Sequence, residues 1–170
     1  MRVLGIDCGS QITGLGLIAS DGRRHQVVSY TVIRAARGED FPGRLQRIHV
    51  GITQAILDHR PEWVAIEDIF YADNVRSALK LGHVRGVAMQ AAAAQGVAVA
   101  EYTPLAVKSA LTGYGRAAKE QVRHMVARLL GLAEADLPLD ASDALAVAIC
   151  HLHSYPREGA ARRGQDRARR

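Results

Sequence analysis

The chain of 170 residues is poor in cysteine and has no long apolar run. Its two cysteines, Cys8 and Cys150, are too few for a disulfide framework or a four-cysteine zinc site, so we expect free thiols in a reducing compartment. No apolar stretch reaches the roughly 20 residues that a membrane-spanning helix needs. Near the N-terminus, Asp7 interrupts the only apolar run, so we expect no signal peptide. These absences predict a cytoplasmic protein that does not engage a membrane.

The composition is that of a globular protein, with 48% hydrophobic and 23% charged residues. No internal repeat or linker divides the chain, and we expect one domain over residues 1–155. Much of the net charge of +5 lies in residues 156–170, which contain six arginines and two acids. This segment lacks periodic apolar residues and is predicted to be a basic, disordered tail. It either keeps the protein in solution or makes weak contacts with nucleic acid phosphates.

Hydrophobic periodicity predicts an α/β fold in which three strands come first and helices then alternate with strands. The predicted strands cover residues 3–7, 13–18, 25–33, 63–67 and 97–102, and the predicted helices cover 45–59, 75–95, 104–111, 119–130 and 140–153. The first three strands are separated by short turns and are therefore antiparallel. This order predicts a five-stranded mixed sheet, three antiparallel strands followed by two parallel ones, with helices on both faces.

Two predicted strands end in an acid, Asp7 in the first strand and Glu67 in the fourth. Asp140 and Asp143 lie one turn apart at the start of the last predicted helix, on the same face. Each position has a simpler explanation, since Asp7 can cap a turn and the two others can cap the helix and complement its dipole. The last helix is otherwise apolar on that face, however. It must pack on the sheet, which brings its acids towards the strand ends.

Four converging carboxylates repel one another, and bound cations relieve that repulsion. A ligand set made only of oxygen suits Mg²⁺ or Mn²⁺ rather than zinc. Two such ions about 3.5–4 Å apart activate a water and stabilise the leaving oxygen in phosphodiester cleavage. The histidines are scattered and no Ser/His/Asp set stands out, so we expect a metal-dependent phosphodiesterase with Mg²⁺ as cofactor, two ions per site, replaceable by Mn²⁺.

Four motifs, in collinear order from residue 1 to about 153, resemble the RuvC family of Holliday-junction resolvases. The motifs are residues 5–10 (GIDCGS), 65–70 (AIEDIF), 74–86 (NVRSALKLGHVRG) and 140–146 (DASDALA). The resemblance implies the RNase H-like fold and a crossover junction endodeoxyribonuclease of recombination and repair. It also implies a homodimer that makes two symmetric nicks in four-way junction DNA and works with the RuvA–RuvB branch-migration complex.

The resemblance also assigns roles to individual residues. Asp7, Glu67, Asp140 and Asp143 match the metal-binding acids of the family. Lys119 matches a basic residue near the scissile phosphate, and Lys108 matches another that is implicated in activity. Phe70 matches an aromatic residue that stacks on unpaired bases. Two positions depart from the pattern: Cys8 replaces a proline, and Asp73 stands where relatives often have a basic residue.

Further DNA contacts are suggested by residue type. An aromatic side chain exposed in a loop next to an acidic site suits stacking on bases, and Tyr71 adjoins Phe70. Packing of Phe70 under its own loop is the competing interpretation. Basic residues near the motifs are candidate phosphate contacts: Arg76, Lys80, Arg85, Arg116 and Arg123. Gly82 and Gly86, one turn apart in a long predicted helix, favour close approach to the sheet or to a second subunit.

Three other functions compete with junction resolution. An RNase H-like nuclease acting on structured RNA, as in processing of ribosomal RNA precursors, has the same acids. An actin-like ATPase has a phosphate loop similar to residues 5–10, but it needs a second lobe that 170 residues do not supply. A junction-binding module without catalysis has no use for four acids beside DNA.

Overall fold

The structure is a computed structural model that describes residues 1–68 and 75–168, with side chains described up to residue 155. Its elements in chain order are β1 (Arg2–Asp7), β2 (Ile12–Ser20), β3 (His25–Arg34), α1 (Phe41–His59), β4 (Trp63–Glu67), α2 (Val75–Ala94), β5 (Ala98–Tyr102), α3 (Pro104–Thr112), α4 (Lys119–Leu130), a 3₁₀ turn η1 (Glu134–Asp136) and α5 (Leu139–Ala168). None of the described helices is long and apolar enough to cross a membrane.

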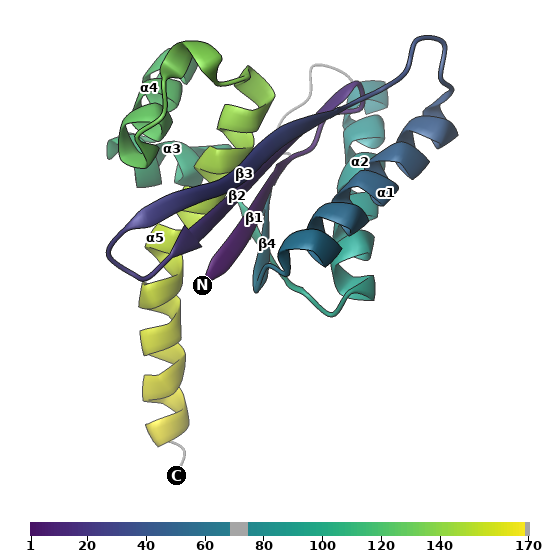
Figure 1. The fold of residues 1–170 in the computed structure, drawn as a ribbon. Helices are drawn as coiled ribbons and strands as arrows, with labels where there is room; N and C mark the ends of the chain where they lie inside the picture. The colour runs from purple at the N-terminus through teal and green to yellow at the C-terminus, as the bar shows by residue number, and fades with distance from the viewer. Residues whose placement is uncertain (69–74, 169–170) are drawn as a thin grey trace.

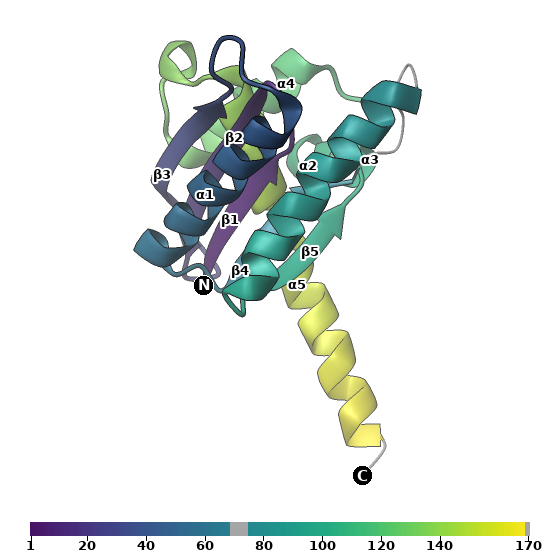
Figure 2. The same ribbon diagram turned by 90° about the vertical axis from the view of Figure 1, so that its right-hand side faces the viewer.

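The five strands form one mixed sheet in the order β3-β2-β1-β4-β5. β1, β2 and β3 pair antiparallel, and β4 and β5 continue the sheet in parallel beside β1. Helices α1 and α2 cover one face, and α3, α4 and α5 cover the other (Figures 1 and 2). The predicted fold class, including the three antiparallel and two parallel strands, is confirmed.

Side chains that alternate along the strands divide the interior into two cores. Leu4 and Ile6 of β1 are buried under α1 and α2, whereas Val3 is buried on the side of α5. On the first side, α1 contributes three isoleucines at four-residue spacing, Ile48, Ile52 and Ile56. The sheet is therefore covered on both faces around β1, the strand that ends in Asp7.

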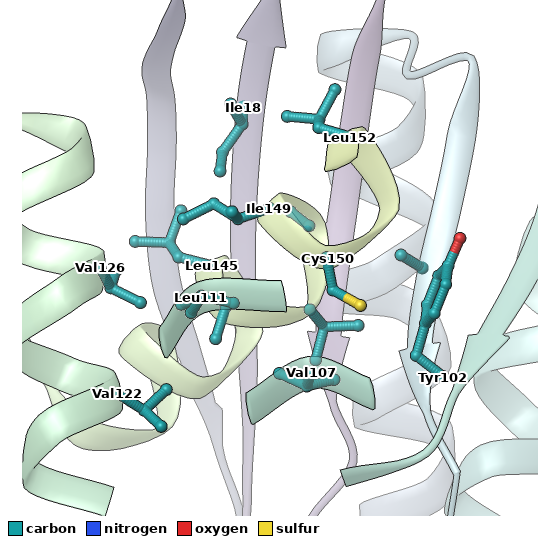
Figure 3. Packing of buried hydrophobic residues seen from close by; sticks show 14 of the residues in the cluster. Ile18, Tyr102, Val107, Leu111, Val122, Val126, Leu145, Ile149, Cys150 and Leu152 are labelled. Atoms are coloured by element: carbon teal, nitrogen blue, oxygen red, sulfur yellow. The ribbon is translucent and has the colours of Figure 1, made fainter. Parts of the chain in front are cut away.

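Helix α5 forms the centre of the second core (Figure 3). Its side chains are almost all buried from Ala141 to Leu152, and many of them are alanines. The backbone of α5 lies directly on glycines of β1 and β2. A Cβ atom at Gly5 would overlap the carbonyl oxygen of Ala144, and one at Gly14 would overlap the carbonyl oxygen of Asp140. The missing side chains therefore let the helix touch the strands, and α5 starts at the strand ends.

A histidine completes the same core at the far end from Asp7. His151 is 1% exposed, and a hydrogen bond of 2.8 Å joins its Nδ1 to the Tyr102 hydroxyl. Its ring also stacks near Trp63 and Tyr155. Burial lowers the pKa of His151 to about 4, so the ring is neutral at physiological pH. Its role is structural, as expected for the scattered histidines.

The last helix is longer than predicted. The sequence predicts its end at His153 and a disordered tail from residue 156, whereas the backbone is helical to Ala168. Alanine and arginine are frequent in this segment and favour helix, whereas Pro156 and the glycines at 159 and 164 disfavour it. In Figure 1 this part of α5 extends away from the sheet, beyond the core.

Replacing Gly5 by alanine tests the direct contact between α5 and the sheet. The added methyl group meets helix backbone, which cannot rotate away, so Gly5→Ala should lower the free energy of unfolding by about 3 kcal/mol. Urea denaturation followed by circular dichroism measures the change. Thr31→Ala, at an exposed position of β3 in the same sheet, is the control and should change it by less than about 0.5 kcal/mol. Equal stability of the two variants would contradict the packing described here.

Candidate active site

The first two acids lie side by side at one end of the sheet. Ile6 of β1 and Ile66 of β4 are paired in the parallel register, so Asp7 and Glu67 follow at the same level on neighbouring strands. Ile6 and Ile66 are buried under α1 and α2. Because side chains alternate, both carboxylates point to the opposite face, where α5 lies.

The other two acids are brought to this place by the start of α5. The contact between Gly14 and the Asp140 backbone sets the first turn of α5 against the end of β2, next to β1. Asp143, one turn later, lines a small cavity of about 60 Å³ together with Glu67, Lys108 and Lys119. Acids from β4 and α5 therefore meet, as the sequence predicts.

A larger cavity, of about 680 Å³, adjoins the same group. Asp7, Glu67 and Lys108 line one side of it. Cys8 and Asp68 also line it, and the rest of its wall is mostly apolar and comes from α2, the start of α3 and the segment before α4: Leu81, Thr103, Pro104, Leu105 and Gly115. Sequence reasoning missed this wall. The only local signal was the exposure expected of a helix start at Pro104.

Repulsion among the acids is visible in their pKa values. Burial, reinforced by the nearby charges of Asp143, Glu67 and Asp140, raises the pKa of Asp7 to about 7. Burial and the charge of Asp143 also raise the pKa of Glu67. In the absence of a cation, Asp7 is therefore protonated in a large fraction of the molecules at neutral pH.

Two lysines partly offset this negative charge. The Nζ atom of Lys119 lies 3.5 Å from Oδ2 of Asp143, and attraction to that carboxylate raises the pKa of the lysine. Lys119 is the first residue of α4, whose start has no side-chain cap, so its cation opposes the helix dipole. The charges of Lys119 and Lys108 both act to lower the pKa of Glu67.

The chemistry of this donor set fits hard divalent cations, because it offers only carboxylate oxygens. Within the described residues, no three His, Cys, Asp or Glu side chains are grouped tightly enough to hold an ion. The paired ends of β1 and β4 and the first turn of α5 nevertheless bring the four acids to one end of the sheet.

The structure describes some of the residues that are predicted to contact DNA. Arg76 and Lys80 are exposed on the first turns of α2, and Arg116 is exposed before α4. The Nζ atom of Lys80 lies 5.7 Å from the centre of the Phe41 ring. Phe70, Tyr71 and Asp73 lie outside the described residues. All of these assignments remain predictions.

Two arginines that the sequence suggested as phosphate contacts are engaged with the protein instead. Arg123 donates from Nη2 to the carbonyl oxygens of Glu134 and Leu137, at 2.6 and 2.9 Å. Arg85 forms ion pairs with Asp68 and Glu101. Helical spacing does not distinguish an arginine facing solvent from one that tilts towards neighbouring loops, so the sequence did not indicate these protein contacts. The suggested phosphate contacts of both arginines stay predictions.

Cys8 is half-buried against the core under α1 and α2. Burial and the neighbouring Asp7 raise the pKa of its thiol to about 12. At neutral pH the thiol is therefore protonated, and a protonated thiol is a poor nucleophile.

A mixed sheet with acids at the ends of two adjacent parallel strands, completed by acids of a helix that crosses its face, defines the RNase H-like class of nucleases. Residues 3–151 match the family described as Crossover junction endodeoxyribonuclease RuvC. A relative of that name from Koribacter versatilis is 56% identical over 156 residues, which cover 91% of this chain and 93% of the relative. The chain belongs to the RuvC family of crossover junction endodeoxyribonucleases.

Solved structures agree with this assignment. Thermus thermophilus RuvC in complex with Holliday junction substrate is matched with a TM-score of 0.87 and 39% identity, over 94% of this chain and 96% of that chain. The yeast mitochondrial Holliday junction resolvase Ydc2 is matched with a TM-score of 0.65 and 14% identity, over 89% of this chain and 77% of that chain. The second likeness shows the shared fold alone.

Removing the charge of Asp7 should stabilise the metal-free protein. A carboxyl group whose pKa is raised on folding keeps its proton longer in the folded state, so stability falls as pH rises from about 4 to about 7. Asp7→Asn removes this loss. At pH 8 in EDTA its free energy of unfolding should exceed that of the wild type by about 2 kcal/mol, with little difference at pH 4.

Urea denaturation at the two pH values measures both quantities. Asp136→Asn makes the same chemical change at an exposed position and should leave the pH dependence as it is. A gain for Asp7→Asn that is the same at pH 4 and pH 8 would show that Asp7 is not held in a repulsive cluster.

Proposed function

We propose that this protein resolves four-way DNA junctions by hydrolysing phosphodiester bonds at the four acids, with Mg²⁺ as the cofactor. The observation that carries the proposal is the meeting of Glu67 and Asp143, from segments far apart in the sequence, in one small cavity with Lys108 and Lys119. Family membership makes the chain a crossover junction endodeoxyribonuclease. The number of ions per site, two, and the replacement of Mg²⁺ by Mn²⁺ belong to the proposal.

In this mechanism Asp7, Glu67, Asp140 and Asp143 would hold the divalent ions, which would supply a water nucleophile at neutral pH and Lewis-acid stabilisation of the phosphate. The raised pKa of Asp7 means that it binds an ion best after losing its proton, which the ion itself favours. Lys119, beside Asp143, stabilises the negative charge that develops on the transferring phosphate.

The surroundings of the acids suit a DNA strand. Lys108 lines both cavities, which supports a role for it in contacting a phosphate next to the one that is cut. The apolar wall around Leu105, which is 60% exposed, offers a surface for sugar or base. Exposed Arg76, Lys80 and Arg116 extend the basic surface, and Phe70 and Tyr71 are proposed to stack on unpaired bases. We also propose that the protein acts on DNA in the cytoplasm and that RuvA–RuvB are its partners.

Cleavage assays on an immobile four-way junction test the metal-site assignment. In Mg²⁺, Asp7→Asn should abolish nicking. It should not weaken junction binding in EDTA, because it removes a negative charge that repels phosphates. Undiminished nicking by Asp7→Asn would overturn the assignment. Cleavage of structured RNA in preference to the junction would favour the RNA-processing alternative, and ATP hydrolysis without DNA would favour the ATPase.

Two symmetric nicks require two active sites, and we propose that α2 forms the dimer contact. The outer side of α2 carries an apolar groove of about 810 Å³ that includes Leu79, Gly82 and Gly86. Leu79 is 60% exposed, and nothing in the described structure lies within 4 Å of a Cβ built at either glycine. Figure 2 shows α2 on the outside of the molecule, beside α1. A second copy of α2 fits there, because the two glycines permit close helix approach.

A charge placed in this groove should separate the subunits. We expect Leu79→Glu to raise the dimer dissociation constant at least tenfold, about 1.4 kcal/mol or more, as measured by sedimentation equilibrium. The matched control is Leu57→Glu, at an α1 leucine that is 53% exposed and lies outside the groove. If the two variants dimerise equally well, α2 is not the contact.

A further inference from the structure

Arg85 of α2 joins three elements close to the acids. Its Nη1 atom lies 2.9 Å from Oδ1 of Asp68, and its Nη2 atom pairs with the carboxylate of Glu101. Asp68 directly follows β4, and Glu101 belongs to β5. The arginine side chain is only 16% exposed, whereas its partners are 41% and 45% exposed. The guanidinium therefore lies between the helix and the ends of two parallel strands.

Asp68, which Arg85 holds in this way, directly follows Glu67, a metal ligand of the proposed site. The backbone N–H of Asp68 donates to the carbonyl oxygen of Tyr102 at 2.7 Å, which prolongs the pairing of β4 with β5. The Asp68 side chain is fixed by Arg85. Both anchors of Asp68 fix the backbone immediately after Glu67.

Glu67 needs such support, because its own carboxylate has none. Among the described residues no hydrogen bond or ion pair to its carboxylate is found, whereas the neighbouring Asp143 is paired with Lys119. The Glu67 side chain can rotate, and the position of its backbone decides which places its carboxylate can reach. The ion pairs of Arg85 hold that backbone through Asp68.

On this basis, and given the proposed function, we propose that Arg85 is a positioning residue. Its forked ion pairs with Asp68 and Glu101 fix the end of β4, so that Glu67 faces Asp7 and Asp143 and can share a cation with them. Arg85 touches neither substrate nor metal. It acts through the strand end, as outer-sphere partners of metal ligands do, whose loss typically weakens metal binding about 10- to 100-fold.

The sign of the effect on metal affinity separates positioning from simple electrostatics. Arg85→Met removes a positive charge near the acids, so electrostatics alone predicts tighter cation binding. Positioning predicts weaker binding. Arg85→Lys keeps the charge but loses the fork that contacts two carboxylates at once, so electrostatics predicts no change and positioning again predicts weaker binding.

The experiment measures Mn²⁺ binding to the full chain without DNA, by the electron paramagnetic resonance signal of free Mn²⁺. We expect the dissociation constant to rise about 10-fold in Arg85→Met and about 3-fold or more in Arg85→Lys. Single-turnover nicking of saturating junction should slow by similar factors, while junction affinity in EDTA stays unchanged. Arg47→Met, which breaks an arginine–carboxylate pair with Glu39 at the start of α1, is the matched control and should change none of these quantities.

Unchanged or tighter Mn²⁺ binding by folded Arg85→Met would overturn the proposal. If that variant does not fold, wild-type Mn²⁺ affinity in Arg85→Lys would overturn it equally. The proposed function fails on separate grounds, namely if the wild-type chain itself neither binds Mn²⁺ nor nicks the junction.

Discussion

The contact between α5 and the glycines of β1 and β2 is the constraint on which the rest of this structure depends. Gly5 and Gly14 leave room for helix backbone, so α5 lies on the strands without intervening side chains. This closeness decides where α5 begins, and therefore where Asp140 and Asp143 lie relative to Asp7. A side chain at either glycine would lift the helix and separate the two halves of the acid group.

Repulsion among the four acids destabilises the folded domain, and packing elsewhere in the domain offsets it. Asp7 sits at the end of a buried strand with a pKa near neutrality, and its neighbours repel it. Two cores, one on each face of the sheet, hold the strands in place against this repulsion. This repulsion lowers the stability of the cation-free domain at neutral pH.

Charged residues around the site divide into two kinds. Lys119 and Lys108 line the small cavity together with Glu67 and Asp143. Arg85 and Arg123 contact the protein next to the segments that carry the acids, Arg85 at Asp68 after β4 and Arg123 at Glu134 and Leu137 before α5. The guanidinium group, with several donors in a fixed plane, suits such contacts with more than one partner.

The sequence by itself determined the order of the strands and helices, because apolar periodicity and turn residues are local signals. It also indicated the four acids: Asp7 and Glu67 because each ends an apolar strand, and Asp140 and Asp143 because they share one face of a helix that is otherwise apolar there. Only the tertiary structure decided that Gly5 and Gly14 are contact surfaces for α5, that Leu105 forms a wall opposite the acids, and that Arg85 bridges Asp68 and Glu101. Each of these depends on pairs of residues that are distant in the chain, and their side-chain directions follow from packing rather than from any local pattern.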